Sequence, residues 1–274
     1  MKSLAVWMLL TFLYQANGMP GSGDEDNNPG VSGDPHFTIP LMGNETLCYS
    51  IQGYAGLTFN LISNPHLTVN ALFIDSVNDS TEATWIGKLA VIPQNMQKAQ
   101  AIIFDSVKQE VVLPNQGKLK ASVIRQITIQ ASGHINIKFT KGLVPKQGPI
   151  ANLIKVSHEQ LKAKFDVTFH PDHLDVDWKI QDQLIPHSHG LMGQFMANGV
   201  TVDRVKQILI RPDLPPVPVQ LGEVWSYNPV INSTSPCWHA KNYGHQGEGL
   251  IEGNIFDYIV TSVLQKNFAF VKHK

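Results

Sequence analysis

From Phe37 onward, short apolar or alternating runs recur along the chain. Alternation with a period of two places every second side chain on the same face of a strand. Turn residues such as Asn64-Pro65 and Ser132-Gly133 separate the runs. Many short strands at this spacing predict an all-β fold, an antiparallel sandwich or barrel. The predicted strands cover residues 47–51, 56–62, 67–74, 84–92, 101–104, 110–113, 123–130, 135–140, 164–169 and 174–180.

Helical periodicity is confined to two stretches in the last third of the chain. Residues 201–208 and 255–264 show it, and we predict short helices there. Residues 212–220 are rich in proline and predict an extended connector across the surface. A ligand for a proline-recognising domain is the alternative for this segment. No internal repeat interrupts the pattern, so we predict one folded domain over residues 34–274.

The first 18 residues have the form of a secretory signal peptide. Lys2 precedes an apolar run over residues 4–14, and the small residues Ala16 and Gly18 follow. The run is too short to span a bilayer, and we predict cleavage after Gly18 and a secreted protein. An uncleaved anchor is the alternative. Residues 19–33 are acidic and rich in Gly and Pro, and predict a disordered leader.

Composition narrows the choice of partners. The chain has 274 residues, of which 43% are hydrophobic and 16% charged, and its net charge is −1. This balance fits a folded protein and gives no reason to expect nucleic acid or an anionic membrane as partner. Basic residues are scattered along the sequence, without a cluster that marks a polyanion site. No nucleotide-binding, nucleophile-elbow or zincin motif occurs, so we predict no cofactor.

The cysteine count points to a single disulfide. The chain has only two cysteines, Cys48 and Cys237. In an oxidising compartment an even pair is typical of one bridge, and closing so long a loop stabilises by roughly 5 kcal/mol. A free thiol or an intermolecular link is the alternative.

Three sequons agree with secretion. They begin at Asn44, Asn78 and Asn232, and each predicts a surface position if glycosylated.

The most reactive peptide bond in the chain joins Asp34 to Pro35. The aspartate carboxyl can attack its own carbonyl carbon, form a five-membered anhydride and expel the proline nitrogen. His36 follows directly, and histidine is well suited to deliver a proton at mildly acidic pH. The residue types therefore allow self-cleavage. An ordinary turn leading into the first strand is the competing interpretation.

The histidines invite a metal hypothesis. His170 and His173 form an HxxH pattern, and His187 and His189 form an HxH pattern. Both patterns occur in zinc sites when the backbone geometry suits. Because a Pro-Asp turn interrupts the HxxH pair, we favour solvent-facing turn histidines and predict no metal there.

Two sets of acidic and amide residues are candidates for a calcium site or a catalytic pair. Asn198 and Asp203 follow a glycine-framed bend at residues 189–195 and are weak calcium candidates, although a plain turn explains them equally well. Asp175 and Asp177 would share one strand face, which makes a glycosidase pair conceivable. A solvated strand face is the simpler interpretation of that pair.

Taken together, several motifs in order resemble the C-terminal, propeptide-like region of inter-alpha-trypsin inhibitor heavy chains. The residues that carry the resemblance are Gly33-Asp34-Pro35-His36-Phe37, Leu47-Cys48-Tyr49-Ser50-Ile51, Gly190-Leu191-Met192-Gly193-Gln194-Phe195, Cys237-Trp238 and Asp257-Tyr258. The first and third of these also resemble the von Willebrand factor type D module. The resemblance extends over roughly residues 32–266.

The resemblance implies a specific chemistry. In that family the chain is cut between the matching Asp and Pro, and the new C-terminal aspartate is esterified to chondroitin sulfate. The heavy chain can then pass to hyaluronan in the extracellular matrix. By resemblance, Asp34 would be the electrophile and the attachment residue, and Pro35 the leaving group. With cleavage after Gly18, about 16 residues would precede Pro35, so we expect no counterpart here of the family's large N-terminal portion with its von Willebrand type A domain.

The sequence therefore supports two main hypotheses. The first is a secreted glycoprotein module of hyaluronan metabolism and the matrix, which cleaves itself at Asp34–Pro35. It would not be an enzyme beyond that single turnover, and its partners would be hyaluronan, chondroitin sulfate or inter-alpha-inhibitor-type matrix proteins. The second is a non-cleaving extracellular domain that binds a protein or a glycosaminoglycan.

Overall fold

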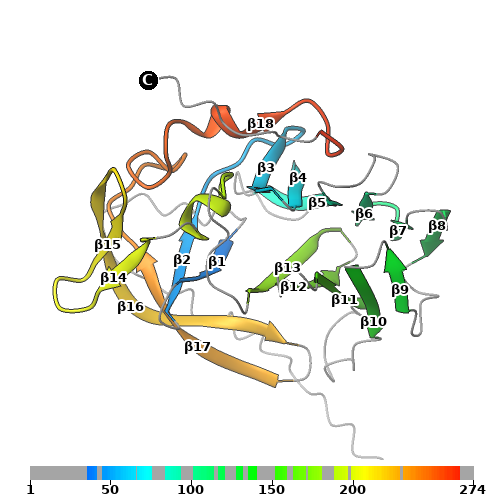
Figure 1. Ribbon diagram of the computed structural model, residues 1–274, viewed down its shortest axis with the longest axis horizontal. Coiled ribbons are helices and arrows are strands. Elements are labelled where there is room, and N and C mark those ends of the chain that lie inside the picture. Colours follow the sequence, from blue (N-terminus) through cyan, green and yellow to red (C-terminus); the bar gives the residue numbers. More distant parts are fainter. Residues whose placement is uncertain are drawn as a thin grey trace, which may run out of the picture. The chain divides into compact units, whose positions relative to one another are not determined.

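Strands make up almost all the regular structure of the chain, a computed structural model of which is shown in Figure 1. The only helices among the described residues are two short 3-10 helices, η4 (Gly193–Met196) and η5 (Ile255–Tyr258). The predicted all-β fold is confirmed. The structure describes residues 36–41, 45–65, 67–75, 84–93, 101–113, 117–120, 128–131, 135–140, 152–158, 163–170, 172–180, 188–196, 199–228 and 231–265.

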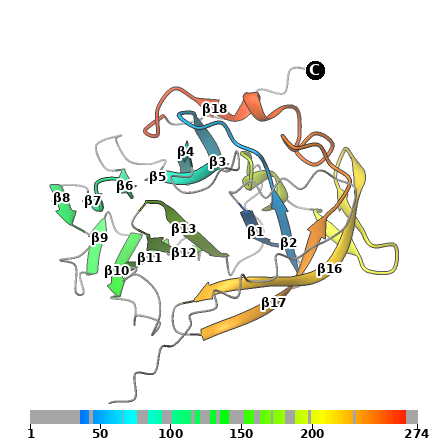
Figure 2. The same cartoon turned by 180° about the vertical axis from the view of Figure 1, so that it is seen from behind.

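One sheet has six strands in the order β1-β2-β17-β16-β15-β14. All its neighbours are antiparallel except β17 and β2, which run parallel. β16 and β17 form a long hairpin that is visible from both sides (Figures 1 and 2). The strands are β1 (His36–Pro40), β2 (Thr46–Ser50), β14 (Thr201–Asp203), β15 (Ile208–Arg211), β16 (Leu214–Asn228) and β17 (Ile231–Ala240).

The second sheet has twelve strands and branches at β5. One path runs β18-β3-β4-β5-β13-β12-β11-β10-β9, and β6, β7 and β8 extend from β5 on the other branch. The described strands do not form a closed barrel. The strands are β3 (Thr58–Ser63), β4 (Leu67–Asp75), β5 (Thr84–Pro93), β6 (Ile102–Asp105), β7 (Glu110–Leu113), β8 (Gly117–Lys120), β9 (Thr128–Ala131), β10 (Ile135–Thr140), β11 (Asn152–His158), β12 (Ala163–Phe169), β13 (Leu174–Ile180) and β18 (Ile259–Val260).

A single large apolar cluster holds residues from both sheets together. Phe59 and Phe73 pack in the cluster with ring centroids 4.8 Å apart, and both side chains are fully buried. Strand β3 is buried along its whole length, including the polar residues Thr58, Asn60 and Ser63 that alternate with its apolar ones. All described residues belong to one compact unit, Val31–Lys274.

The predicted helix at residues 201–208 is wrong. Strands β14 and β15 form a hairpin there, and the turn between them is capped by Asp203, whose Oδ1 accepts hydrogen bonds from the backbone of Val205 and Lys206 at 3.0 Å each. Gln207 closes the turn in the left-handed region, at φ 52°. The apolar spacing in this stretch fits a hairpin as well as a helix. The pairing of β14 with β15 decides which of the two forms.

Two further predictions needed correction. The proline-rich segment 212–220, predicted as an extended connector, is extended, but most of it belongs to the sheet as part of β16, where Val217 pairs with Leu209 of β15. The second predicted helix, at 255–264, is limited to the four residues of η5. Asn254 caps η5, and the chain then enters β18, which pairs with β3. Among the described residues no helix is long and apolar enough to cross a membrane.

Candidate functional site

The predicted cleavage site lies where the described residues begin. Asp34 and Pro35 fall outside them, and His36 is described through its backbone as the first residue of β1. The structure thus describes the strand that starts directly after the bond, and the elements that hold this strand.

Strand β1 pairs with β2, and the end of β2 is held by a tyrosine from the C-terminal segment. His36 lies opposite Ser50. The Ser50 backbone N–H donates to the Tyr243 hydroxyl at 2.9 Å, and this hydroxyl donates to the Ser50 carbonyl at 2.8 Å. Since these Ser50 groups face Tyr243, His36 and Ser50 form the kind of antiparallel pair that exchanges no hydrogen bonds. Pro40, which has no N–H, occupies the equivalent position four residues later.

A tyrosine with its ordinary pKa of about 10 is protonated at neutral pH, and burial moves the titration of Tyr243 further from neutrality. Burial raises the pKa of the Tyr243 hydroxyl, and the hydrogen bond to Ser50 only partly offsets that effect. The hydroxyl therefore remains both donor and acceptor. Sequence reasoning missed Tyr243, because no local pattern connects it to a strand 193 residues earlier.

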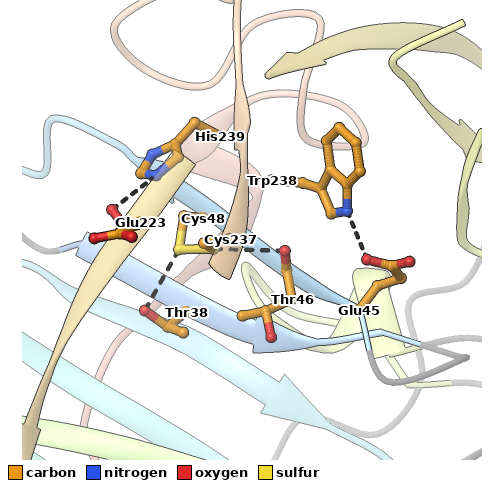
Figure 3. The surroundings of a disulfide bond; sticks show 8 residues. All are labelled: Thr38, Glu45, Thr46, Cys48, Glu223, Cys237, Trp238 and His239. Carbon is orange, nitrogen blue, oxygen red and sulfur yellow. Dashed lines mark hydrogen bonds between the residues drawn. A yellow bond between two sulfur atoms is a disulfide. The ribbon is translucent and has the colours of Figure 1, made fainter. Parts of the chain in front are cut away.

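On the side of β2 that faces away from β1, a disulfide joins β2 to the next strand of the sheet, β17 (Figure 3). Cys48 and Cys237 are bridged with a Cα–Cα distance of 5.9 Å, and both are buried. The parallel pairing of β2 with β17 covers only Trp238↔Leu47 and His239↔Cys48, so the bridge strengthens a short junction. The Thr38 hydroxyl of β1 lies 3.8 Å from the Cys48 sulfur.

A carboxylate anchors the loop between β1 and β2. Glu45 accepts a hydrogen bond from the Trp238 indole at 2.6 Å, and Arg204 of the β14–β15 turn also pairs with it. These contacts, visible in part in Figure 3, connect the loop to two other strands of the sheet. Asn44, the first predicted glycosylation residue, directly precedes Glu45 but lies outside the described residues.

The glycine-framed segment that contributed to the resemblance has a structural role. The Leu191 and Met192 backbone N–H groups donate to the carbonyls of Asn60 and Leu61 in β3, at 3.0 and 2.9 Å. Gly190 adopts a φ of +102°, and a Cβ there would lie 2.5 Å from the Leu61 carbonyl oxygen. Only glycine allows this close approach to β3.

A tyrosine of β2 contacts the same segment. The Tyr49 hydroxyl donates to the Leu191 carbonyl at 2.7 Å. Burial is the main reason that the pKa of Tyr49 lies well above its usual value. The nearby Tyr258 and Tyr243 raise it further. The segment thus connects β3 of one sheet with β2 of the other.

Of the two weak calcium candidates, Asp203 is among the described residues and Asn198 is not. The Asp203 carboxylate is occupied as the cap of its own turn, and Lys206 lies 3.8 Å away. The hydrogen bond from the Lys206 backbone is the main reason that the pKa of Asp203 is lowered. Asn198 lies outside the described residues. Among the residues that the structure describes, no group of three or more His, Cys, Asp or Glu could hold a metal.

The HxxH histidines stack rather than converge. The His170 and His173 rings are parallel, with centroids 4.3 Å apart, and Trp85 packs against His173 at 4.2 Å. His173 Nδ1 lies 2.7 Å from the Asp172 carboxylate. Of the HxH pair, His189 forms an isolated β-bridge with Ser63, whereas His187 lies outside the described residues.

The remaining sequence candidates are described only through their backbone. Asp175 and Asp177 are in β13, opposite Thr168 and Asp166 of β12. Asn232 is in β17, opposite Tyr227 near the end of the long hairpin. Asn78 lies outside the described residues.

Comparison with known proteins finds relatives, although no family model matches the chain. Inter-alpha-trypsin inhibitor heavy chain H3 of Mesocricetus auratus is 28% identical over 256 residues, which cover 85% of this chain and 27% of the heavy chain. Heavy chain H1 of Homo sapiens is 25% identical over 257 residues, and heavy chain H2 of Sus scrofa is 23% identical over 257 residues. The chain is related to the inter-alpha-trypsin inhibitor heavy chains. It spans about a quarter of the length of these curated relatives, since the matches cover 26–27% of them.

The relationship agrees with the resemblance read from the sequence motifs. Matches over 84–87% of the chain reach well beyond a single motif. Three of the described motif residues, Tyr49, Gly190 and Trp238, form contacts between elements that are distant in the sequence.

Proposed function

We propose that this chain is a secreted glycoprotein module that cleaves itself once at Asp34–Pro35 and acts in hyaluronan metabolism and the extracellular matrix. The relationship to inter-alpha-trypsin inhibitor heavy chains over most of the chain carries the proposal. The Asp-Pro bond supports it, because it precedes β1 directly and the strand after it is held by pairing with β2.

The proposed reaction is intramolecular. An oxygen of the Asp34 side chain attacks its own main-chain carbonyl carbon, and the bond to the Pro35 nitrogen breaks as that nitrogen takes up a proton. His36 is the proposed proton donor. Water or a sugar hydroxyl then opens the anhydride and yields a free or esterified C-terminal aspartate. A sugar hydroxyl of chondroitin sulfate or hyaluronan would give a matrix-linked leader.

The consequence of cleavage follows from the position of the disulfide. Both Cys48 and Cys237 lie after the bond, so the bridge would retain the strands but not the leader before Pro35. The folded part would stay intact, with Pro35 as its new N-terminus.

The experiment is intact mass measurement with N-terminal sequencing of the secreted protein, before and after incubation at mildly acidic pH. We expect a fragment that begins at Pro35, and none from Asp34→Ala. Asp34→Glu is the matched control, because it keeps the charge but needs a six-membered ring for the same attack, and it should cleave much more slowly. A start at Met19 that is stable through acid would refute self-cleavage.

The alternative is a non-cleaving domain that binds an extracellular protein or a glycosaminoglycan. It is favoured by the position of the Asp-Pro pair at the entry of a strand, since such pairs are common in turns. Under this alternative, Asp34→Ala would change neither the mass nor the binding of inter-alpha-inhibitor-type proteins. A glycoside-acting enzyme is the third option, and loss of turnover on replacement of Asp175 or Asp177 would identify it.

A further inference from the structure

Four strands of the branched sheet bring a row of charged residues together. Lys88 of β5 lies opposite Asp105 of β6, which lies opposite Glu110 of β7, which lies opposite Lys120 of β8. Two ion pairs run across the row, Lys88–Asp105 at 3.2 Å and Lys120–Glu110 at 2.9 Å. Residues that are scattered in the sequence therefore form one charged face.

The acids of this face are little exposed and are already paired. The Asp105 side chain is only 8% exposed and binds both Lys88 and the backbone N–H of Lys108. The Glu110 side chain is 17% exposed and binds Lys120. The Lys88 and Lys120 side chains are 31% and 56% exposed. An approaching solute thus meets ammonium groups before carboxylates.

Two more lysines add positive charge to the face. Lys108 is in the exposed turn between β6 and β7, and Lys118 is exposed on β8, two residues before Lys120. The hydrogen bond from Lys120 is the largest cause of the lowered pKa of Glu110; burial opposes it, and the charges of Lys118 and Lys108 add to the lowering. Four lysines against two occupied acids leave the face with an excess of two positive charges.

We propose that this lysine face, formed by Lys88, Lys108, Lys118 and Lys120, binds a sulfated polysaccharide chain without a covalent bond. Lys118 and Lys120 are about 6.6 Å apart along one strand face, at roughly 3.3 Å per residue, so they can meet successive anionic groups of a linear chain. The inference rests on the extracellular location in the proposed function.

The chemistry of the face favours a polysaccharide over a bilayer. A peripheral membrane site combines cations with apolar side chains that enter the lipid. Among the described residues around Lys108, Val107 is the one strongly exposed apolar side chain, at 69%. A charged strand face with one exposed valine suits a hydrated polyanion. A simpler explanation is that the lysines on the edge strand β8 only prevent pairing with other chains. The experiment must distinguish this role from ligand binding.

The test compares binding of the secreted protein to immobilised chondroitin sulfate over a series of salt concentrations. The variant is K108Q/K118Q, because neither side chain is needed for the two ion pairs of the row. We expect its affinity to fall about fivefold at about 0.1 M salt, as for two exposed ion pairs, with a shallower salt dependence. The control K206Q/K241Q has the same net charge as K108Q/K118Q but leaves the lysine face unchanged, so it should bind like the wild type.

Two other ligands test which class of molecule the face binds, and one further variant separates this inference from self-cleavage. Unsulfated hyaluronan should compete poorly, and vesicles containing phosphatidylserine should not retain the protein. Asp34→Ala should bind like the wild type, so the inference and self-cleavage can fail separately. Equal binding by K108Q/K118Q, an equal loss in the control, equal binding of hyaluronan, or preference for vesicles would each overturn the inference. Aggregation of K108Q/K118Q with unchanged binding would assign the lysines to edge protection.

Discussion

Replacement of Gly190 by alanine should destabilise the protein far more than an ordinary change of glycine to alanine. The φ of +102° is in the left-handed region, where a Cβ costs about 1–2 kcal/mol. The new Cβ would also lie 2.5 Å from the Leu61 carbonyl oxygen and 2.8 Å from Asn60 Oδ1. The first of these contacts is 0.9 Å shorter than the 3.4 Å at which ordinary contact begins, and both neighbours are buried in β3.

The clash must move the backbone, because the nearest atom is a main-chain carbonyl. Overpacking of this kind costs about 1–3 kcal/mol. The shift would also weaken the hydrogen bonds from Leu191 to Asn60 and from Met192 to Leu61, each of which contributes about 1 kcal/mol. If about half of the energy of those two hydrogen bonds is lost, the three contributions sum to about 3–6 kcal/mol in the free energy of unfolding.

Gly56 provides the matched control. Its φ is +81°, but a Cβ there would have no atom within 4 Å, so Gly56→Ala should cost only the backbone part, about 1–2 kcal/mol. The assay is urea denaturation of both variants and the wild type, followed by tryptophan fluorescence. Losses that agree within about 0.5 kcal/mol would refute the argument, since the close approach to β3 would then contribute nothing.

Three other perturbations test separate parts of the structure. The variant C48A/C237A should lose about 2–5 kcal/mol and gain a steeper urea dependence, because closing a loop with a sequence separation of 189 restricts the unfolded chain; an unchanged urea slope would contradict this. Tyr243→Phe should lose about 1–3 kcal/mol, since both Ser50 hydrogen bonds disappear, and a thermal midpoint equal to wild type would argue against the anchor. At Asp172, burial is the largest single influence and raises the pKa, but His173, a backbone hydrogen bond and His170 together lower it more, so the net pKa lies below the 3.8 of a free aspartate. Its stabilisation is therefore complete above that value and is lost as pH falls through the folded-state pKa, so Asp172→Asn should destabilise at neutral pH and match the wild type in strong acid. Urea midpoints that differ equally at both pH values would exclude this linkage.

Sequence patterns predicted the class of fold, because alternation and continuous apolar runs reflect how each strand is buried. In β3 the polar residues Thr58, Asn60 and Ser63 are buried as well, which the alternation in the sequence does not reveal. The helix predicted at residues 201–208 is wrong. An apolar spacing that also fits a helix was resolved by the pairing of β14 with β15, in which a turn capped by Asp203 replaces the helical hydrogen bonds.

The candidate site divides in the same way. The reactive Asp34–Pro35 bond and the pairing of two cysteines can be read from residue types alone, because their chemistry is local or is limited to one choice. The anchor of Ser50 by Tyr243 could not be foreseen, since it joins residues 193 positions apart. Likewise the sequence shows scattered lysines, and only the strand register places Lys88 in one row with Lys120.

By itself, then, the sequence predicted a signal for export and a reactive bond, and it indicated the single disulfide and the strand-rich fold that the structure has. These depend on composition, on short-range periodicity and on covalent chemistry, which are all present in the linear chain. Only the tertiary structure decided which glycine must stay a glycine, which tyrosine holds β2 and which lysines share a face. Those properties depend on distances between segments far apart in the chain, which arise when the sheets pack and the strand register is set.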